Sequence, residues 1–321
     1  MLLSFLFILV SATASQAGKF KGVSSDYSFD LAGASNPDWM SKLPDDASLP
    51  SLSIPGTHNS MGDMYGDSFF RFQNTELETQ LEAGIRYLDF SVRVKYDILE
   101  ISHASFLCDV GLGGALDVIF EFLDENPSET VILRLRKGYL RSGDDETFEK
   151  TMEKYLGTSG YLVSGVGEYV YYDRDGILSI PNLGQLRGKV LILQDFQTKT
   201  PGRFGIPWKS DSLAVTDRKL AIGGAGLSLK WLGVQSSLQA AHKETANKLH
   251  ITHTSVSLGY TPAKAAGGKK TNKDGMNDRL GKYLDDGKIG RVGIVAMDFP
   301  GKQLVDQIIR LNDFFYPPTS P

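Results

Sequence analysis

The stretch ALDVIFEFLDENPSETVILRLRK, residues 115–137, decides the class of fold. Its first half repeats apolar residues three and four positions apart and closes at Pro127, which predicts an amphipathic helix over 115–127. Its second half, 130–137, is a short run rich in Val, Ile and Leu, which predicts a β-strand. Strands that alternate with helices are typical of proteins built on a parallel sheet.

The same alternation extends along most of the chain. Seven further runs have the length and composition of strands, at 51–58, 86–94, 98–105, 188–196, 212–217, 250–257 and 291–299. Four further helical patterns lie at 75–84, 144–157, 236–248 and 276–287. Eight strands alternating with helices predict a single α/β domain, a TIM-type (β/α) barrel. We expect this barrel to be distorted, because the second and third strands are too close together for a helix between them.

The overall composition is that of a soluble globular protein. The chain has 321 residues, of which 41% are hydrophobic and 22% charged, enough to bury a large core. Its net charge of -4 disfavours a nucleic-acid partner, since such binders concentrate Lys and Arg. Cys108 is the only cysteine, so no internal disulfide can form.

The N-terminus has the pattern of an exported protein. An apolar run is followed by small residues that end in Ser15-Gln16-Ala17, a pattern typical of a cleaved signal peptide. An ordinary buried segment is the alternative interpretation. We therefore expect a secreted, extracellular protein with a signal peptide over 1–17, an irregular segment over 18–44 and the catalytic barrel over 45–321.

Polar side chains gather where the predicted strands end. In a (β/α) barrel these carboxyl ends and the loops after them build the active site. The residues there are His58, Asp89, Arg93, His103, Arg136, Lys137, Asp195, Asp217 and Asp298. Histidines exchange protons near neutral pH, and cations stabilise charge on a phosphoryl group. The pattern therefore predicts acid/base chemistry on an anion.

Other polar residues have simpler interpretations. We interpret His242, His250 and His253 as ordinary surface or core residues with satisfied hydrogen bonds. Arg86 and Arg93 can be explained as partners of nearby acids, Asp89 or Asp97.

Five segments carry a resemblance to a known family. They are SIPGTHNS (53–60), EAGIRYLDFSVRV (82–94), ISHASF (101–106), ENPSETVILRLRKGY (125–139) and VGIVAMDF (292–299). In order and spacing they resemble the X-type catalytic barrel of phosphatidylinositol-specific phospholipase C, particularly its single-domain secreted form. The resemblance covers roughly residues 45–315 and is most specific in its first half.

The resemblance implies an activity and roles for several residues. His58 would act as general base on the inositol 2-hydroxyl, oriented by Asp298, and His103 would protonate the departing diacylglycerol oxygen. The products would be diacylglycerol and inositol 1,2-cyclic phosphate. The implied partner is phosphatidylinositol or a related glycerophospholipid at a membrane surface, which Phe69 and Phe70 would contact. No stable protein partner is implied, and we expect a monomer.

The resemblance also bears on calcium. Calcium-using members carry Asn beside the first histidine, two acids two residues apart in the second strand and a glutamate that ends the fourth. This chain has Asn59 and Asp89, but Ser91 and Arg136 occupy the other two positions. Calcium needs several anionic oxygens, and a guanidinium would repel it. We therefore expect no cofactor, with calcium disfavoured.

The metal-free members differ from this chain as well. They place an arginine at the position of Ser91, an aspartate at that of Asn59 and an aspartate at that of Asp298. Of these three residues, this chain has only Asp298. We expect Arg136, with Lys137 or Arg93, to stabilise the phosphate charge in place of a metal. The residues expected to contact substrate are Asn59, Asp89, Arg93, Lys137 and Asp217.

Two alternatives remain open. One is another secreted phosphodiesterase on a similar barrel, such as a metal-dependent glycerophosphodiesterase or sphingomyelinase-like enzyme, whose site would need acids clustered around a metal. The other is a non-catalytic relative that binds phosphoinositides, because Ser91 and Asn59 depart from the metal-free pattern.

Overall fold

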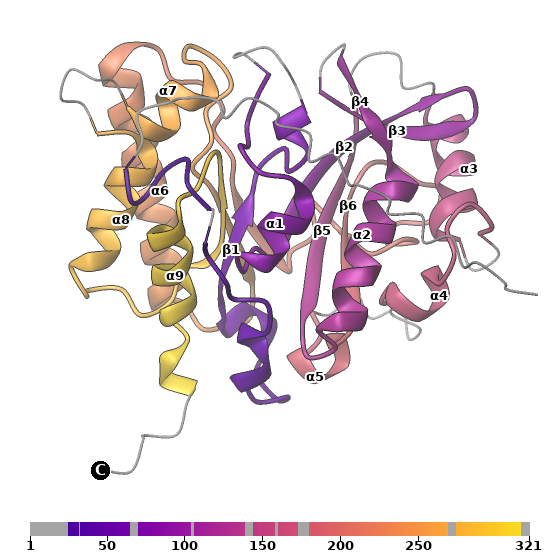
Figure 1. The fold of residues 1–321 in the computed structure, drawn as a ribbon, viewed down its shortest axis with the longest axis horizontal. Helices are drawn as coiled ribbons and strands as arrows, with labels where there is room; N and C mark the ends of the chain where they lie inside the picture. Colours follow the sequence, from indigo (N-terminus) through magenta and orange to yellow (C-terminus); the bar gives the residue numbers. More distant parts are fainter. Residues whose placement is uncertain are drawn as a thin grey trace, which may run out of the picture.

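The computed structural model describes residues 25–31, 33–64, 70–103, 106–138, 144–157, 160–172, 180–268 and 274–315. Its strands form one curled sheet flanked by helices (Figure 1). The strands are β1 Ser53–Thr57, β2 Tyr87–Lys95, β3 Ile98–His103, β4 Phe106–Gly111, β5 Thr130–Lys137, β6 Lys189–Asp195, β7 Ile206–Pro207, β8 Leu213–Thr216, β9 Leu249–His253 and β10 Gly293–Met297. All eight predicted strands are present, and β4 and β7 are additional.

The sheet is a distorted barrel, as predicted. Its hydrogen-bonded order is β7-β6-β5-β2-β1-β10-β9-β8, and the neighbours along this path run parallel. Within the described part of the chain no ladder joins β7 to β8, so the barrel is open on that side. The short link after β2 makes β2 and β3 antiparallel, and β4 extends this hairpin. The predicted lack of a helix between these strands is therefore confirmed.

Helices flank the sheet. They are α1 Leu77–Glu82, α2 Leu112–Glu125, α3 Asp145–Leu156, α4 Val166–Tyr169, α5 Leu183–Leu186, α6 Gly223–Lys243, α7 Pro262–Gly267, α8 Met276–Asp285 and α9 Lys302–Arg310. Short 3-10 turns are η1 Trp39–Lys42, η2 Leu49–Ser51, η3 Gly62–Met64 and η4 Asp313–Phe315. All five predicted helices are present, but α6 begins well before residue 236. The prediction missed this start because the glycines of the first turns have low helix propensity. No helix in the described ranges has the length and hydropathy to cross a membrane.

Two apolar clusters hold these layers together. The larger one lies between the sheet and the first helices, where Leu116 and Ile119 of α2 are fully buried. The second joins α6 and α8 to β10, through side chains such as Leu238, Leu280 and Val295. The larger cluster reaches the histidines at the strand ends, because Trp208 and Phe70 pack against it.

Gly56 fixes how closely β1 approaches β2. Its Cα is in register with Tyr87, and a Cβ built at Gly56 would lie 2.7 Å from the Cβ of Tyr87. A larger residue would therefore push the two strands apart. The close approach brings His58, which follows β1, towards the polar face of β2.

Arg86, directly before β2, forms a buried ion pair at the end of the barrel where the parallel strands begin. Its Nε lies 2.9 Å from Oε2 of Glu129, and its Nη1 donates to the carbonyl of Leu81 at 2.7 Å. Glu129 also accepts from the amide of Met40 at 3.1 Å, which ties the N-terminal segment to the barrel. The interpretation of Arg86 as a partner of Asp89 or Asp97 is therefore wrong, because Glu129 occupies that role.

Replacing Glu129 with alanine is expected to lower the free energy of unfolding by about 3–5 kcal/mol, because Arg86 would remain buried without a counter-charge. Denaturant titration of both proteins measures the difference. The matched control is the exposed Glu78→Ala, for which a change within about 0.5 kcal/mol is expected. A loss at Glu129 no larger than at Glu78 would contradict the structural role of the pair.

Candidate active site

His58 is held rigidly where β1 ends. Its amide donates to the carbonyl of Met297 at 2.9 Å. The Nε2 group of Gln73 donates to the carbonyls of both His58 and Met297, at 2.8 and 3.0 Å. Asn59 follows with a φ of 43°, in the left-handed region that non-glycine residues rarely adopt. This conformation turns the chain directly after the histidine.

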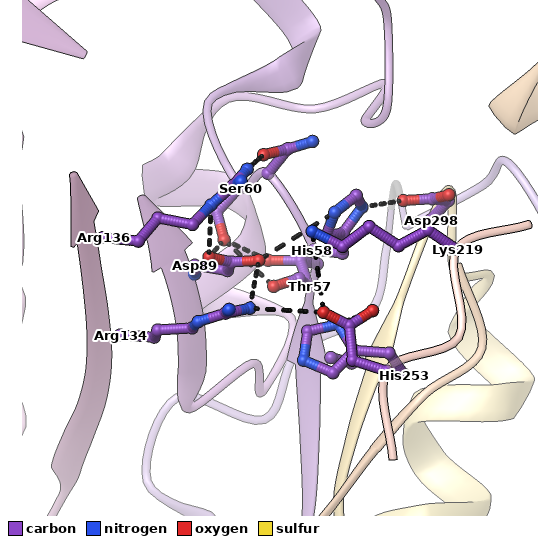
Figure 2. A network of polar contacts seen from close by, with 12 residues as sticks. Thr57, His58, Ser60, Asp89, Arg134, Arg136, Lys219, His253 and Asp298 are labelled. Carbon is purple, nitrogen blue, oxygen red and sulfur yellow. Dashed lines mark hydrogen bonds and ion pairs between the residues drawn. The ribbon is translucent and has the colours of Figure 1, made fainter. Parts of the chain in front are cut away.

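The ring of His58 is paired with Asp298 (Figure 2). Its Nδ1 lies 2.9 Å from Oδ1 of Asp298, and both side chains are almost fully buried. Asn277 secures the carboxylate's backbone by donating to the carbonyls of Asp298 and Phe299, both at 2.9 Å. Because Asp298 engages Nδ1, the other nitrogen, Nε2, is left to exchange a proton. It lies 4.0 Å from Oδ2 of Asp89.

Burial disfavours charge on this pair. It lowers the pKa of His58 well below its ordinary value, and the nearby Arg136 and Lys219 lower it further. It also raises the pKa of Asp298 well above the range of an exposed carboxyl. The imidazole of His58 is therefore neutral at pH 7 and able to accept a proton at Nε2.

His103 reaches the same space from a different element. It ends β3, so it comes from the hairpin above β2 and not from a strand of the barrel wall. The ring of Phe72 contacts both histidines, with centroids 4.6 Å from His103 and 5.1 Å from His58. Burial lowers the pKa of His103 to about 4, and the charges of Arg136 and Lys219 contribute.

Arg136 crosses the sheet beside Ser91. The two residues are in register on β5 and β2. The guanidinium of Arg136 donates from Nη2 to Oδ1 of Asn59 at 2.5 Å, and its Nε lies 3.5 Å from Oδ1 of Asp89. Since β2 lies between β5 and β1, this side chain passes over β2, where the small Ser91 leaves room for it. Arg136 thus places a guanidinium beside Ser91, the position where the metal-free members carry an arginine.

Arg134 is the centre of the charged network, and the sequence prediction missed it. Its Nη2 lies 2.6 Å from Oδ2 of Asp195, and its Nη1 lies 3.5 Å from Asp89 and 3.8 Å from Asp217. Its guanidinium lies over the ring of Trp208, 3.9 Å from the centroid. The signal was present in the alternation of β5, which places Arg134 and Arg136 on the same face.

The arginines determine the charge of Asp89. Burial alone would raise the pKa of this carboxyl, but the guanidinium groups of Arg134 and Arg136 outweigh it and lower the pKa below its usual range. Asp89 is therefore ionised. It can stabilise a positive charge on His58 once that ring takes up a proton.

Lys219 and His253 complete the mouth around Asp217 (Figure 2). Nζ of Lys219 lies 3.6 Å from Oδ2 of Asp217, and Nδ1 of His253 lies 4.0 Å from Oδ1. The ring of His253 is fully buried, 5.8 Å from that of His58, and neither of its nitrogens has a hydrogen-bond partner. The interpretation of His253 as a satisfied residue is therefore wrong. No spacing in the sequence marked it or Lys219.

Several predicted residues lie apart from this cluster. Lys137 pairs with Asp145 at 2.8 Å and lies over the ring of Phe148, so its ammonium is directed towards α3. Arg93 is buried on β2 opposite Glu100 of β3, above the level of Ser91. Phe70 is half-buried with its ring 5.9 Å from His103, whereas Phe69 lies outside the described residues, as does the predicted signal peptide.

The arrangement matches a known family. The model of the phosphatidylinositol-specific phospholipase C X domain matches residues 56–195. The 1-phosphatidylinositol phosphodiesterase of Listeria monocytogenes is 33% identical over 294 residues, which cover 86% of this chain and 85% of that protein. The chain belongs to the phosphatidylinositol-specific phospholipase C family. A 1-phosphatidylinositol phosphodiesterase of Staphylococcus aureus is 24% identical, over 90% of this chain and 98% of that protein.

Solved structures agree with this membership. The phosphatidylinositol-specific phospholipase C of Listeria monocytogenes superposes with a TM-score of 0.72 at 31% identity, over 86% of this chain and 98% of that chain. A Staphylococcus aureus phospholipase C gives a TM-score of 0.66 at 20% identity, over 88% of this chain and 99% of that chain. The chain therefore shares the barrel fold of the solved phospholipase C structures.

The charges around Asp89 differ from those of a typical calcium site. Calcium prefers six to eight oxygen ligands, several of them anionic. Here Asp89 lies between two guanidinium groups, and Oδ1 of Asn59 already accepts from Arg136. Among the described residues, no group of three or more His, Cys, Asp or Glu side chains is arranged to hold a metal ion.

The buried histidines predict how stability depends on pH. Burial lowers the pKa of His253 from 6.5 to about 4. Below pH 6.5 the unfolded chain therefore takes up a proton that the folded protein refuses, so stability falls as the pH drops towards 4. His253→Gln removes this titrating group and is expected to flatten the fall in melting temperature between pH 7 and pH 4.5. Over its full titration the group changes the free energy of unfolding by about 3 kcal/mol. Thermal melts of both proteins across this range measure it, and parallel curves would contradict the prediction.

Proposed function

We propose that this protein cleaves phosphatidylinositol on the glycerol side of its phosphodiester, giving diacylglycerol and inositol 1,2-cyclic phosphate. One observation carries the proposal. Nδ1 of His58 is engaged by Asp298, while its Nε2 remains available in a space that His103 and Arg136 also border. The family membership supports it, as does the similarity to relatives that are 1-phosphatidylinositol phosphodiesterases.

The proposed reaction needs one proton acceptor and one proton donor. His58 takes the proton from the inositol 2-hydroxyl as that oxygen forms its bond to phosphorus. The bond from phosphorus to the glycerol oxygen breaks, and His103 gives that oxygen a proton. Attack from within the substrate removes most of the entropy cost of bringing the two atoms together, and each proton transfer contributes about 10²–10⁴-fold. The negative phosphodiester beside His103 would raise the ring's pKa above its value in the free protein.

Arg136 supplies the positive charge that calcium supplies in other members. It borders the space between the histidines and is anchored by Asn59 and Asp89, so its position is fixed before substrate binds. Lys219 adds a second cation, since its charge lowers the pKa of both His58 and His103. The reaction is therefore proposed to be independent of metal ions.

The inositol ring is proposed to bind beside Asp217. This carboxylate, the unpartnered nitrogens of His253 and the guanidinium of Arg134 form a polar wall next to the ring of Trp208. A polyhydroxylated ring offers donors and acceptors to these groups. Both nitrogens of His253 and Oδ1 of Asp217 lack hydrogen-bond partners in the described part of the protein and could bind its hydroxyls. Lys137 is omitted from this set because it is directed towards α3.

Export and the oligomeric state complete the proposal. The pattern of residues 1–17 supports secretion of the mature chain. The chain is proposed to act as a monomer on a lipid surface. A metal-dependent phosphodiesterase is disfavoured, because it would need several acids free to hold a metal where Asp89 is bound by two arginines.

Release of diacylglycerol from defined vesicles tests the substrate class. The purified protein is expected to release it from vesicles that contain phosphatidylinositol and to leave pure phosphatidylcholine vesicles intact. Equal release from both lipids would show that the headgroup is not recognised. No release from either would favour the non-catalytic alternative.

A further inference from the structure

The exposed face of α6 is apolar where a solvent-facing helix is normally polar. Ile222, directly before the helix, is 70% exposed, and Leu229 and Leu232 are 52% and 59% exposed. With the exposed Ala225 they repeat at intervals of three and four residues, so they share one face. The opposite face already packs in the second apolar cluster through Leu227, Val234 and Leu238. The outer leucines are therefore not needed to fold the helix.

Two further leucines extend this face towards the mouth of the barrel. Leu220 and Leu258 form a β-bridge with each other and are 43% and 58% exposed. The amide of Ala221 donates to the carbonyl of Leu258 at 3.0 Å, which holds that leucine beside the start of α6. Together Leu220, Ile222, Leu229, Leu232 and Leu258 make up what is here called the α6 patch. Several exposed apolar side chains on neighbouring segments mark an interaction surface, unlike a single exposed leucine.

The α6 patch adjoins the site directly. Leu220 follows Lys219, whose ammonium points into the mouth beside Asp217 (Figure 2). Between Gly223 and Ala241 the only charged residue is Lys230, and its side chain is buried. Charge returns to the exposed face at Lys243, at the far end of the helix. The apolar surface is thus confined to the half of α6 next to the mouth.

We propose that the α6 patch docks on the surface of the lipid bilayer that holds the substrate. The proposal rests on the proposed function of the same mouth, because the acyl chains of the lipid stay in the bilayer while its phosphodiester reaches His58. The rim beside His58 must then touch the bilayer. Burying an uncharged leucine face at the boundary of the acyl chains makes the free energy of membrane binding more favourable, whereas burying a polar face there would not.

Charge at the rim fits the same occupant. Arg218 is exposed directly beside Lys219, at the edge of the α6 patch. Phosphatidylinositol is an anionic lipid, and each basic residue near an anionic surface is attracted to it. The patch therefore combines an apolar face with a basic edge, a combination that suits an anionic bilayer better than a second copy of this acidic protein.

The test compares Leu229→Ser/Leu232→Ser with the intact chain. Binding is measured by sedimentation with vesicles of phosphatidylcholine and phosphatidylglycerol, which contain no inositol lipid and permit no turnover. The double variant is expected to bind on the order of a hundredfold more weakly, because each exposed leucine that enters lipid is worth about a factor of ten. Its activity on a water-soluble inositol phosphodiester and its melting temperature are expected to stay unchanged.

The matched control is Phe314→Ser. Phe314 is 63% exposed in η4, which follows α9 at the bottom of Figure 1, far from the β3–β4 hairpin at the top. This variant is expected to bind vesicles like the intact chain. An active enzyme whose vesicle binding is insensitive to the α6 substitutions would overturn the docking proposal. So would a dimer in solution that the double variant dissolves. An inactive chain that still binds through the α6 patch would instead count against the proposed function alone.

Discussion

Replacing His58 with alanine is expected to lower the turnover of phosphatidylinositol by a factor on the order of 10⁴, the upper end of what one general base supplies. His58 is buried, its Nδ1 is fixed by Asp298, and burial lowers its pKa, so the ring is neutral at pH 7 and Nε2 is available for the proton of the attacking hydroxyl. The Asp298 carboxylate 2.9 Å from Nδ1 holds the ring with Nε2 as the nitrogen left for proton transfer. The rate on phosphatidylinositol vesicles measures the loss.

A matched control separates catalysis from folding. His250 is also a buried histidine with an acidic partner, Glu244 at 3.2 Å, but it lies near the start of β9, at the end of the barrel away from the mouth. His250→Ala is expected to retain most of the activity even if it lowers the melting temperature. Comparable activity in both variants would remove His58 from the mechanism.

The leaving group distinguishes the two histidines. A substrate whose leaving group needs no protonation, such as an inositol nitrophenyl phosphate, is expected to restore much of the rate of His103→Ala. It should leave His58→Ala inactive, because the attacking hydroxyl still needs a base. Rescue of both variants, or of neither, would contradict the assignment of base and acid.

Replacing Arg136 with serine is expected to lower turnover by about 10²–10³-fold, the usual loss when one group that stabilises transition-state charge is removed. Added calcium is not expected to restore the rate, because Arg134 still holds Asp89 and the other positions of the calcium pattern remain unoccupied by acids. Steady-state rates with calcium and with EGTA measure both effects. Restoration by calcium would show that the arginine only replaces a metal site that the fold still contains.

The position of Ser91 offers a second arm of this experiment. Ser91 and Arg136 are in register on adjacent strands, and the guanidinium of Arg136 crosses β2 at this point. Moving the arginine by Arg136→Ser/Ser91→Arg is therefore expected to recover part of the lost rate, because a guanidinium returns to the same space. Ser91→Arg alone should reduce activity, since two guanidinium groups would then compete for that space.

Some residues could be predicted because a single rule places them. His58 and Asp298 follow apolar strands directly, and the carboxyl ends of parallel strands meet at one mouth, so their proximity followed from the pattern of strands. The structure joins them at 2.9 Å. Arg136 was predicted on the same ground, although its crossing over Ser91 depends on the order of strands, which local periodicity does not give.

Other residues could not be predicted because they depend on contacts between distant segments. The alternation of β5 places Arg134 on the same face as Arg136, but only the assembled sheet shows that three carboxylates surround it. Arg86 was assigned to acids near it in the sequence, but its partner Glu129 lies 43 residues away, directly before the neighbouring strand β5. His253 ends a strand like His58, yet nothing local distinguishes a ring with free nitrogens from a satisfied one. The start of α6 was missed because its glycines resemble a loop.

Phosphorus NMR of the products, in EGTA, tests the central claim most directly. The protein is incubated with phosphatidylinositol vesicles in the chelator, and the water-soluble product is followed from the earliest times. A resonance of inositol 1,2-cyclic phosphate is expected first, because the 2-hydroxyl attacks phosphorus within the substrate and Arg136 supplies the charge. A first product that is acyclic inositol phosphate, or no product until calcium is added, would contradict metal-free catalysis by His58 and His103.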